Sequence, residues 1–118
     1  EIYGDGEQTR DFTFISDAID ANLAAARDGK DGRVYNVGGG ERASINRVLA
    51  IMEEVSNRRA KRKFLDKQAG DVLHTWADVS RAMKDFGFSP KVKLIDGIRQ
   101  QYEWQHKEIT ECRSTKNY

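Results

Sequence analysis

The residues best suited to binding chemistry lie near the start of the chain, in the loop from Tyr3 to Phe12. Two glycines allow this loop to turn sharply, and Arg10 follows them directly before an aromatic, β-branched run. The planar guanidinium group of an arginine can contact two oxygens of a diphosphate at once, so the pattern indicates a site for a phosphorylated ligand. The alternative is a surface arginine that forms an ion pair with Asp11 or Asp17.

Two further segments have the composition of phosphate-binding sites, but a structural role explains each of them better. The triple glycine at 38–40 precedes a predicted helix, whose N-terminus could hold a phosphate. It lacks the spaced third glycine of a dinucleotide fingerprint, and we interpret it as a strand-to-helix turn. A basic run lacks the interleaved aromatic residues that stack on bases, and we interpret it as a solvated helix end. This run comprises Arg58, Arg59, Lys61, Arg62 and Lys63.

Neither metal binding nor nucleophilic catalysis is indicated. His74, His106 and Cys112 do not have the spacing of metal ligands. They are also too few to identify a Ser-His-Asp or Cys-His arrangement. Trp76 and Trp104 are interpreted as packing residues rather than as a ligand cage. We therefore predict no catalytic and no metal-binding residue in this chain.

The charge balance argues against nucleic acid as a partner. Twenty basic residues face nineteen acidic ones, which leaves a net charge of +1, whereas proteins that bind nucleic acid usually have a large basic excess. A single cysteine allows no intrachain disulfide and favours a reducing, cytoplasmic setting. No apolar run approaches the length of a membrane span, so we expect no membrane partner. The chain begins with Glu1, and we expect it to be a piece of a longer protein.

Hydrophobic spacing and turn residues predict an α/β (α+β) domain in which short strands alternate with helices. The predicted strands cover residues 12–15, 33–37, 63–65 and 72–76. The predicted helices cover about 17–27, 45–55, 78–86 and 94–109, with caps at Ser16 or Asp17, at Ser44 and at Asp78. Ile19, Leu23 and Ala26 share one face of the first helix. We expect residues 1–110 to form one lobe and 111–118 to form a polar tail.

Taken in order, these segments resemble the C-terminal part of an NAD-dependent epimerase/dehydratase of the extended short-chain dehydrogenase/reductase type. The resemblance covers about residues 1–105 and is closest to the UDP-glucose 4-epimerase group. It is carried by 4–17, 34–40, 70–72, 76–78, 89–91 and the closing helix. It implies a C-terminal substrate-binding lobe without the N-terminal Rossmann half.

The resemblance also implies a substrate site. Arg10 matches an arginine that holds the diphosphate of a nucleotide-sugar, and Tyr3 matches an aromatic residue whose loop lines the base pocket. Asp71 matches the aspartate of an Arg-x-Gly-Asp motif that reaches the ribose. Gln68 holds the position of the arginine in that motif, so one of the two usual diphosphate contacts is missing. The neighbouring Lys67 could replace it as a point charge, without the bidentate geometry.

The family binds NAD through a glycine-rich turn and catalyses with a Tyr-x-x-x-Lys pair, and neither occurs in this sequence. We therefore expect a chain that binds a UDP-sugar weakly, binds no NAD by itself and is not catalytic alone. The alternative function is a stand-alone interaction module that kept the fold of the lobe and lost the activity.

The resemblance places the first helix and the segment around Val34 against the nucleotide-binding domain, which this chain lacks. Apolar residues of both segments would then be exposed, and large exposed apolar patches are uncommon on monomers. We therefore expect a homodimer. The residues concerned are Phe12, Phe14, Ile19, Leu23, Val34 and Val37.

Overall fold

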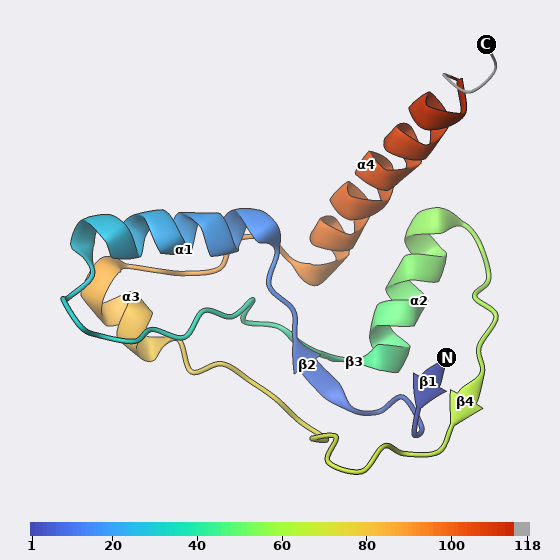
Figure 1. Ribbon diagram of the computed structural model, residues 1–118, viewed down its shortest axis with the longest axis horizontal. Coiled ribbons are helices and arrows are strands. Elements are labelled where there is room, and N and C mark those ends of the chain that lie inside the picture. Colours follow the sequence, from blue (N-terminus) through green and yellow to red (C-terminus); the bar gives the residue numbers. More distant parts are fainter. Residues whose placement is uncertain (115–118) are drawn as a thin grey trace.

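The computed structural model describes residues 1–114 and contains four helices and four short strands in this range (Figure 1). The parallel pair of β1 (Ile2–Tyr3) and β4 (Phe64–Leu65) and the antiparallel pair of β2 (Thr9–Asp11) and β3 (Arg42–Ser44) form two separate two-stranded sheets. This mixture of helices and strands agrees with the predicted fold class. In chain order the elements are β1 (Ile2–Tyr3), β2 (Thr9–Asp11), α1 (Ile15–Asp28), β3 (Arg42–Ser44), α2 (Ile45–Ser56), β4 (Phe64–Leu65), α3 (Ser80–Phe86) and α4 (Leu94–Ser114).

Local capping chemistry determines the ends of the middle helices. The side chain of Ser44 accepts a hydrogen bond from the backbone N–H of Arg47, as predicted for the cap of α2. Gly87 ends α3 with a φ of 71°, a left-handed conformation that glycine adopts without a Cβ penalty. The predicted cap at Asp78 is displaced, because Val79 precedes the first helical residue. The Asp78 carboxylate still accepts a hydrogen bond from the N–H of Ser80, which lowers the pKa of Asp78.

The predicted cap of α1 is wrong. The helix begins at Ile15, after Phe14, and neither Ser16 nor Asp17 caps it. Asp17 instead lies buried on the inner face of the helix, where its Oδ2 accepts hydrogen bonds from the backbone N–H groups of Lys91 and Val92. A residue that looked like a cap thus ties α1 to the connection between α3 and α4.

Three predicted strands are wrong or displaced. The first strand covers Thr9–Asp11 rather than 12–15, and the 72–76 segment forms only one isolated bridge, from His74 to Thr9. Residues 33–37 form no strand, because a strand needs a neighbouring backbone to pair with. This segment lies against α3 instead, where the Val34 carbonyl accepts a hydrogen bond from the Arg81 side chain.

The core consists of two small clusters rather than one. The first contains Ala21 of α1, Ala82 of α3 and Phe88. The second contains Ala43, Ile51 of α2 and Leu94 of α4, with Phe12, Val48, Val55, Ile95 and Ile98 packed against it. Ile19, Leu23 and Val34 are 51%, 65% and 75% exposed, as expected of apolar residues without a partner in this chain. Phe12 and Val37 were expected to be exposed with them, but they pack against the two clusters. Trp76 and Trp104, expected to pack, are also mostly exposed.

The chain is more open than a compact monomer of its mass. It exposes 8968 Å² of accessible surface, whereas about 6,500 Å² is typical at 13.4 kDa. Its radius of gyration of 17.7 Å likewise exceeds the roughly 13.5 Å of a compact domain of this length. Figure 1 shows α4 projecting from the body of the fold. It extends past the predicted boundary at residue 110 to Ser114, and 115–118 of the predicted tail lie outside the described residues.

The contact between Asp17 and the 91–92 backbone predicts a measurable effect on stability. Asp17→Ala should lower the free energy of unfolding by about 1.5–3 kcal/mol, because hydrogen bonds to a buried charged group are lost. The control is Asp20→Ala on the same helix, which removes an exposed ion pair with Lys91 and should cost less than about 1 kcal/mol. Urea unfolding measures both, and equal effects would contradict the structural role of Asp17.

Candidate functional site

Arg10 extends from β2 to a loop about sixty residues further along the chain. Its Nη2 lies 2.6 Å from Oδ1 of Asp71, and its Nη1 donates a hydrogen bond of 2.9 Å to the carbonyl oxygen of Thr9. Both side chains of the ion pair are about a third exposed. The alternative in which Arg10 pairs with Asp11 or Asp17 is therefore wrong.

Those two carboxylates are already occupied by backbone groups. Asp11 accepts hydrogen bonds from the N–H of Gly39 at 2.8 Å and from the N–H of Ala77 at 3.2 Å. Asp17 accepts the two from the 91–92 backbone described above. Arg10 pairs with Asp71 instead.

The loop that carries Asp71 is attached to β2 at Thr9. The N–H of Thr9 donates to the carbonyl of Leu73 at 2.8 Å, and the N–H of Thr75 donates to the carbonyl of Thr9 at 3.2 Å. The Thr9 hydroxyl and Nδ1 of His74 form a further hydrogen bond of 2.9 Å. Sequence reasoning missed this role of Thr9, because nothing local to it indicates a partner so far away.

A small pocket lies beside this attachment. Its volume is about 150 Å³, below the roughly 300–1,000 Å³ of a complete small-molecule site, so the residues form one wall of such a site rather than an enclosed cavity. Two of the predicted site residues, Tyr3 and Asp71, line this pocket. Arg10 does not line it but forms an ion pair with Asp71, which does. Gln68 lies in the turn before Asp71, where its carbonyl accepts the Asp71 N–H. The lining residues are Tyr3, Gly4, Asp5, Gln8, Lys67, Asp71 and Leu73.

The triple glycine does not fit a phosphate or a dinucleotide. The N–H of Gly39 is taken by Asp11, and a Cβ at Gly39 would collide with the carbonyl oxygen of Phe12. Close approach of two backbones therefore requires glycine here. The predicted strand-to-helix turn is wrong, because residues 33–37 form no strand and β3 lies between the glycines and α2. The residues of this chain offer no dinucleotide cradle at this turn.

Part of the basic run pairs with Glu53, a residue of helix α2. Glu53 accepts hydrogen bonds from the N–H of Ala60 at 2.8 Å and from Arg62 at 2.9 Å, and Arg59 lies 3.6 Å away. The Ala60 hydrogen bond, followed by these two arginines, lowers the pKa of Glu53. Within residues 1–114 there is also no cluster of potential metal ligands and no helix long and apolar enough to cross a membrane.

Comparisons with known proteins agree with the resemblance. Residues 1–38 match the family model described as the NAD dependent epimerase/dehydratase family. An uncharacterized UDP-glucose epimerase of Bacillus subtilis is 42% identical over 85% of this chain, and a UDP-glucuronate 4-epimerase of Thermodesulfobacterium geofontis is 34% identical over 98%. The UDP-glucuronic acid 4-epimerase of Bacillus cereus, solved with UDP-glucuronic acid and NAD, superposes with a TM-score of 0.84 at 41% identity over 90% of this chain.

The chain belongs to the NAD-dependent epimerase/dehydratase family. It spans about a third of these relatives, namely 32% and 36% of the two sequences and 34% of the solved chain. The stretch that it matches is the C-terminal part of the epimerase fold. Three predicted substrate residues lie together in the matched stretch, because Tyr3 and Asp71 line the small pocket and Arg10 pairs with Asp71. These residues form the Tyr3–Asp71 wall.

The ion pair predicts how firmly the 66–76 loop is held on β2. Asp71→Asn should measurably speed amide hydrogen exchange at Thr75, by up to about fivefold, because a partly exposed pair contributes roughly 0.2–1 kcal/mol. Asp66→Asn removes the same charge from the same loop at a position where no ion pair is shown, and should leave the rate unchanged. Equal exchange rates in the two variants would contradict the role of the Arg10–Asp71 pair.

Proposed function

We propose that this chain forms the substrate-binding part of a nucleotide-sugar epimerase or dehydratase and binds the nucleotide end of a UDP-sugar. The observation that supports this most is the convergence of Tyr3, Arg10 and Asp71 from two distant segments onto one wall. The binding of UDP-glucuronic acid by the Bacillus cereus relative favours the same class of ligand.

In this proposal Arg10 contacts the diphosphate. A guanidinium group has five N–H donors, and the contacts to Asp71 and to the Thr9 carbonyl leave others for phosphate oxygens. β2 fixes the backbone of Arg10, and Asp71 fixes its side chain, so little conformational freedom is lost on binding. Tyr3 lies beside the base, and Asp71 has a second oxygen available for a ribose hydroxyl.

The charges of the wall favour weak binding by the isolated chain. Lys67 adds a positive charge, but Asp5 and Asp71 line the same small pocket and would repel a diphosphate. Gln68 provides no charge where the resembling motif has an arginine. Affinity therefore depends on Arg10.

Catalysis would be supplied by other parts of the fold. None of the tyrosines in the described chain has a lysine four residues later, so no Tyr-x-x-x-Lys pair is available to transfer a proton. In a complete enzyme this portion would bind and orient the sugar nucleotide, and positioning of that kind can lower a barrier by several kcal/mol.

Replacing Arg10 tests the proposed ligand contact. Arg10→Ala should weaken UDP-glucose binding at least about tenfold, since a charge-assisted contact contributes about 1.5–3 kcal/mol. Arg42→Ala, on the adjacent strand β3, is the matched control and should change the affinity little. An NMR titration reports both. Shifts that cluster at Lys61–Lys63 and persist in Arg10→Ala would place the ligand on the basic run and contradict the proposal.

A substitution at position 68 tests the same contact by strengthening ligand binding instead of weakening it. Gln68→Arg should strengthen UDP-glucose binding, because it adds a bidentate phosphate contact in the turn that precedes Asp71. Gln68→Lys adds the same charge without the planar geometry and should strengthen binding less. An unchanged affinity in Gln68→Arg would show that this turn does not face the diphosphate.

We also propose that the isolated chain forms a homodimer through the exposed stripe on α1. Ile15, Ile19 and Leu23 lie one turn apart and are all more than half exposed. Leu23→Asp should therefore shift the chain to monomer in sedimentation equilibrium at micromolar concentration. Asn22→Asp adds the same charge beside the stripe and should leave the dimer intact. A monomeric wild-type chain would rule out the dimer and favour the stand-alone module.

A further inference from the structure

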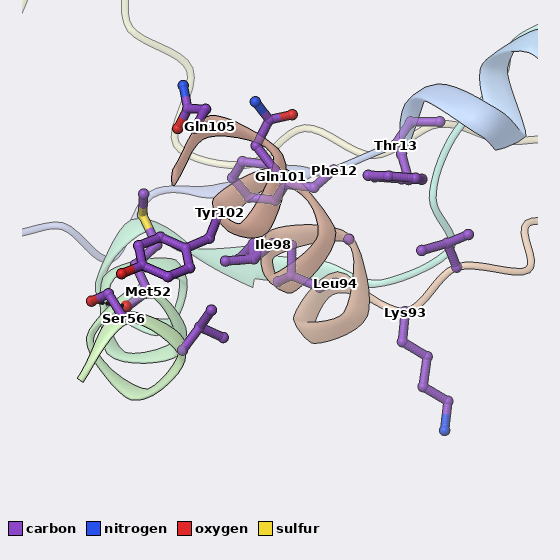
Figure 2. A pocket seen from close by; sticks show the side chains of 14 residues that line it. Phe12, Thr13, Met52, Ser56, Lys93, Leu94, Ile98, Gln101, Tyr102 and Gln105 are labelled. Carbon is purple, nitrogen blue, oxygen red and sulfur yellow. Dashed lines mark hydrogen bonds between the residues drawn. The ribbon is translucent and has the colours of Figure 1, made fainter. Parts of the chain in front are cut away.

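A cavity of about 440 Å³ lies between α2 and α4, apart from the Tyr3–Asp71 wall, and shares no lining residue with it. Figure 2 shows Met52 and Ser56 reaching in from α2 and Tyr102 from α4, whereas Lys93 points away. Lys93 is also the only charged residue among those that line this cavity, so its walls offer little that would orient a charged ligand. Groups of that kind lie instead where the 66–76 loop meets β2.

Apolar packing does little to hold the 66–76 loop. Its large apolar side chains at Val72, Leu73 and Trp76 are 58%, 49% and 72% exposed. Figure 1 shows the segment between β4 and α3 running without a helix or strand of its own. An exposed segment of this kind opens readily unless hydrogen bonds hold it. The position of the loop, and with it that of Asp71, therefore depends on polar contacts with β2.

Thr9 of β2 holds this loop through both its backbone and its side chain. The backbone hydrogen bonds of Thr9 go to the carbonyl of Leu73 and come from the N–H of Thr75. Between these two contacts, Nδ1 of His74 lies 2.9 Å from the Thr9 hydroxyl and forms a hydrogen bond with it. The backbone contacts can form with almost any residue at position 74, whereas the side-chain contact needs a polar atom there. His74 is therefore the side chain that fastens the loop to Thr9.

The seated loop fixes the guanidinium group of Arg10. Its Nη1 donates to the same Thr9 carbonyl that accepts the Thr75 N–H, and its Nη2 pairs with Asp71, three residues before His74. A displaced loop would move Asp71 away and leave the guanidinium group free to adopt other rotamers. A ligand that needs the held rotamer then binds more weakly, in proportion to the fraction of molecules in which the loop is seated.

We propose that His74 is a positioning residue for the diphosphate contact of Arg10. Its hydrogen bond to Thr9 seats the 66–76 loop, and the seated loop brings Asp71 to the guanidinium group. His74 acts through these residues rather than on the ligand, since it does not line the small pocket. This proposal rests on the proposed function, because it takes Arg10 as the residue that contacts the diphosphate.

Two substitutions separate the hydrogen bond from the bulk of the ring. His74→Phe keeps a planar ring without a polar atom, whereas His74→Asn places an amide close to the position of Nδ1. His74→Phe should weaken UDP-glucose binding about three- to fivefold, as expected when one net hydrogen bond no longer seats the loop. His74→Asn should keep the affinity of the unaltered chain. Because His74 is exposed, both variants should fold, and an NMR titration of the 118-residue chain measures both affinities.

A double-mutant cycle tests whether His74 acts through Arg10. With Arg10→Ala already present, His74→Phe should cause no further loss of affinity, because no guanidinium group remains to be positioned. Without ligand, solvent exchange of the Arg10 Nε–H, followed by ¹⁵N NMR, should be faster in His74→Phe than in the unaltered chain or in His74→Asn.

The outcomes separate this proposal from the proposed function. An affinity unchanged in His74→Phe, an equal loss in His74→Asn, a loss that persists beside Arg10→Ala, or unchanged exchange at Arg10 would each overturn the positioning role while Arg10 keeps its ligand contact. An affinity unchanged in Arg10→Ala alone would reject the ligand contact itself, and the role of His74 with it.

Discussion

The arrangement of this chain depends on the hydrogen bonds that the carboxylate of Asp11 accepts. It accepts hydrogen bonds from Gly39 and Ala77, and thereby holds two segments that are far apart in sequence against strand β2. The same strand pairs with β3 and carries the bridge from Thr9 to His74. Arg10 lies between these attachment points and reaches Asp71. The fold of this small chain is organised around three residues of β2 more than around a hydrophobic core.

Local patterns in the sequence predicted those elements whose stabilising contacts are local. The Ser44 cap and the apolar spacing after it predicted α2, and the Gly87 stop and the strand near Phe64 are also correct. The family resemblance correctly identified the C-terminal part of an epimerase fold. The helix ends depend on neighbours within a few residues, and the resemblance depends on an ordered series of motifs, and both can be read from one sequence. The strand near Phe64 is an exception, because its composition predicted it although its partner β1 lies about sixty residues away.

The errors concern residues whose partners lie far away in the sequence. Asp17 looked like a helix cap but accepts hydrogen bonds from the backbone at 91–92, and Arg10 pairs with the distant Asp71 rather than with Asp11 or Asp17. Residues 33–37 have the composition of a strand, yet no other strand lies beside them in the described chain. Trp76 and Trp104 were expected to pack but stay exposed, because the two small clusters do not cover them. Hydrophobic spacing indicates which face of a segment is apolar, but not whether the same chain buries it.

We propose that this chain binds the nucleotide end of a UDP-sugar through Arg10, and we expect it to bind no NAD by itself. Isothermal titration calorimetry of the isolated chain, with UDP-glucose and with NAD in separate experiments, tests it most directly. The account predicts weak, saturable binding of UDP-glucose that is lost in Arg10→Ala, and no binding of NAD at the same concentrations. Micromolar binding of NAD, or binding of UDP-glucose that is unchanged in Arg10→Ala, would contradict it.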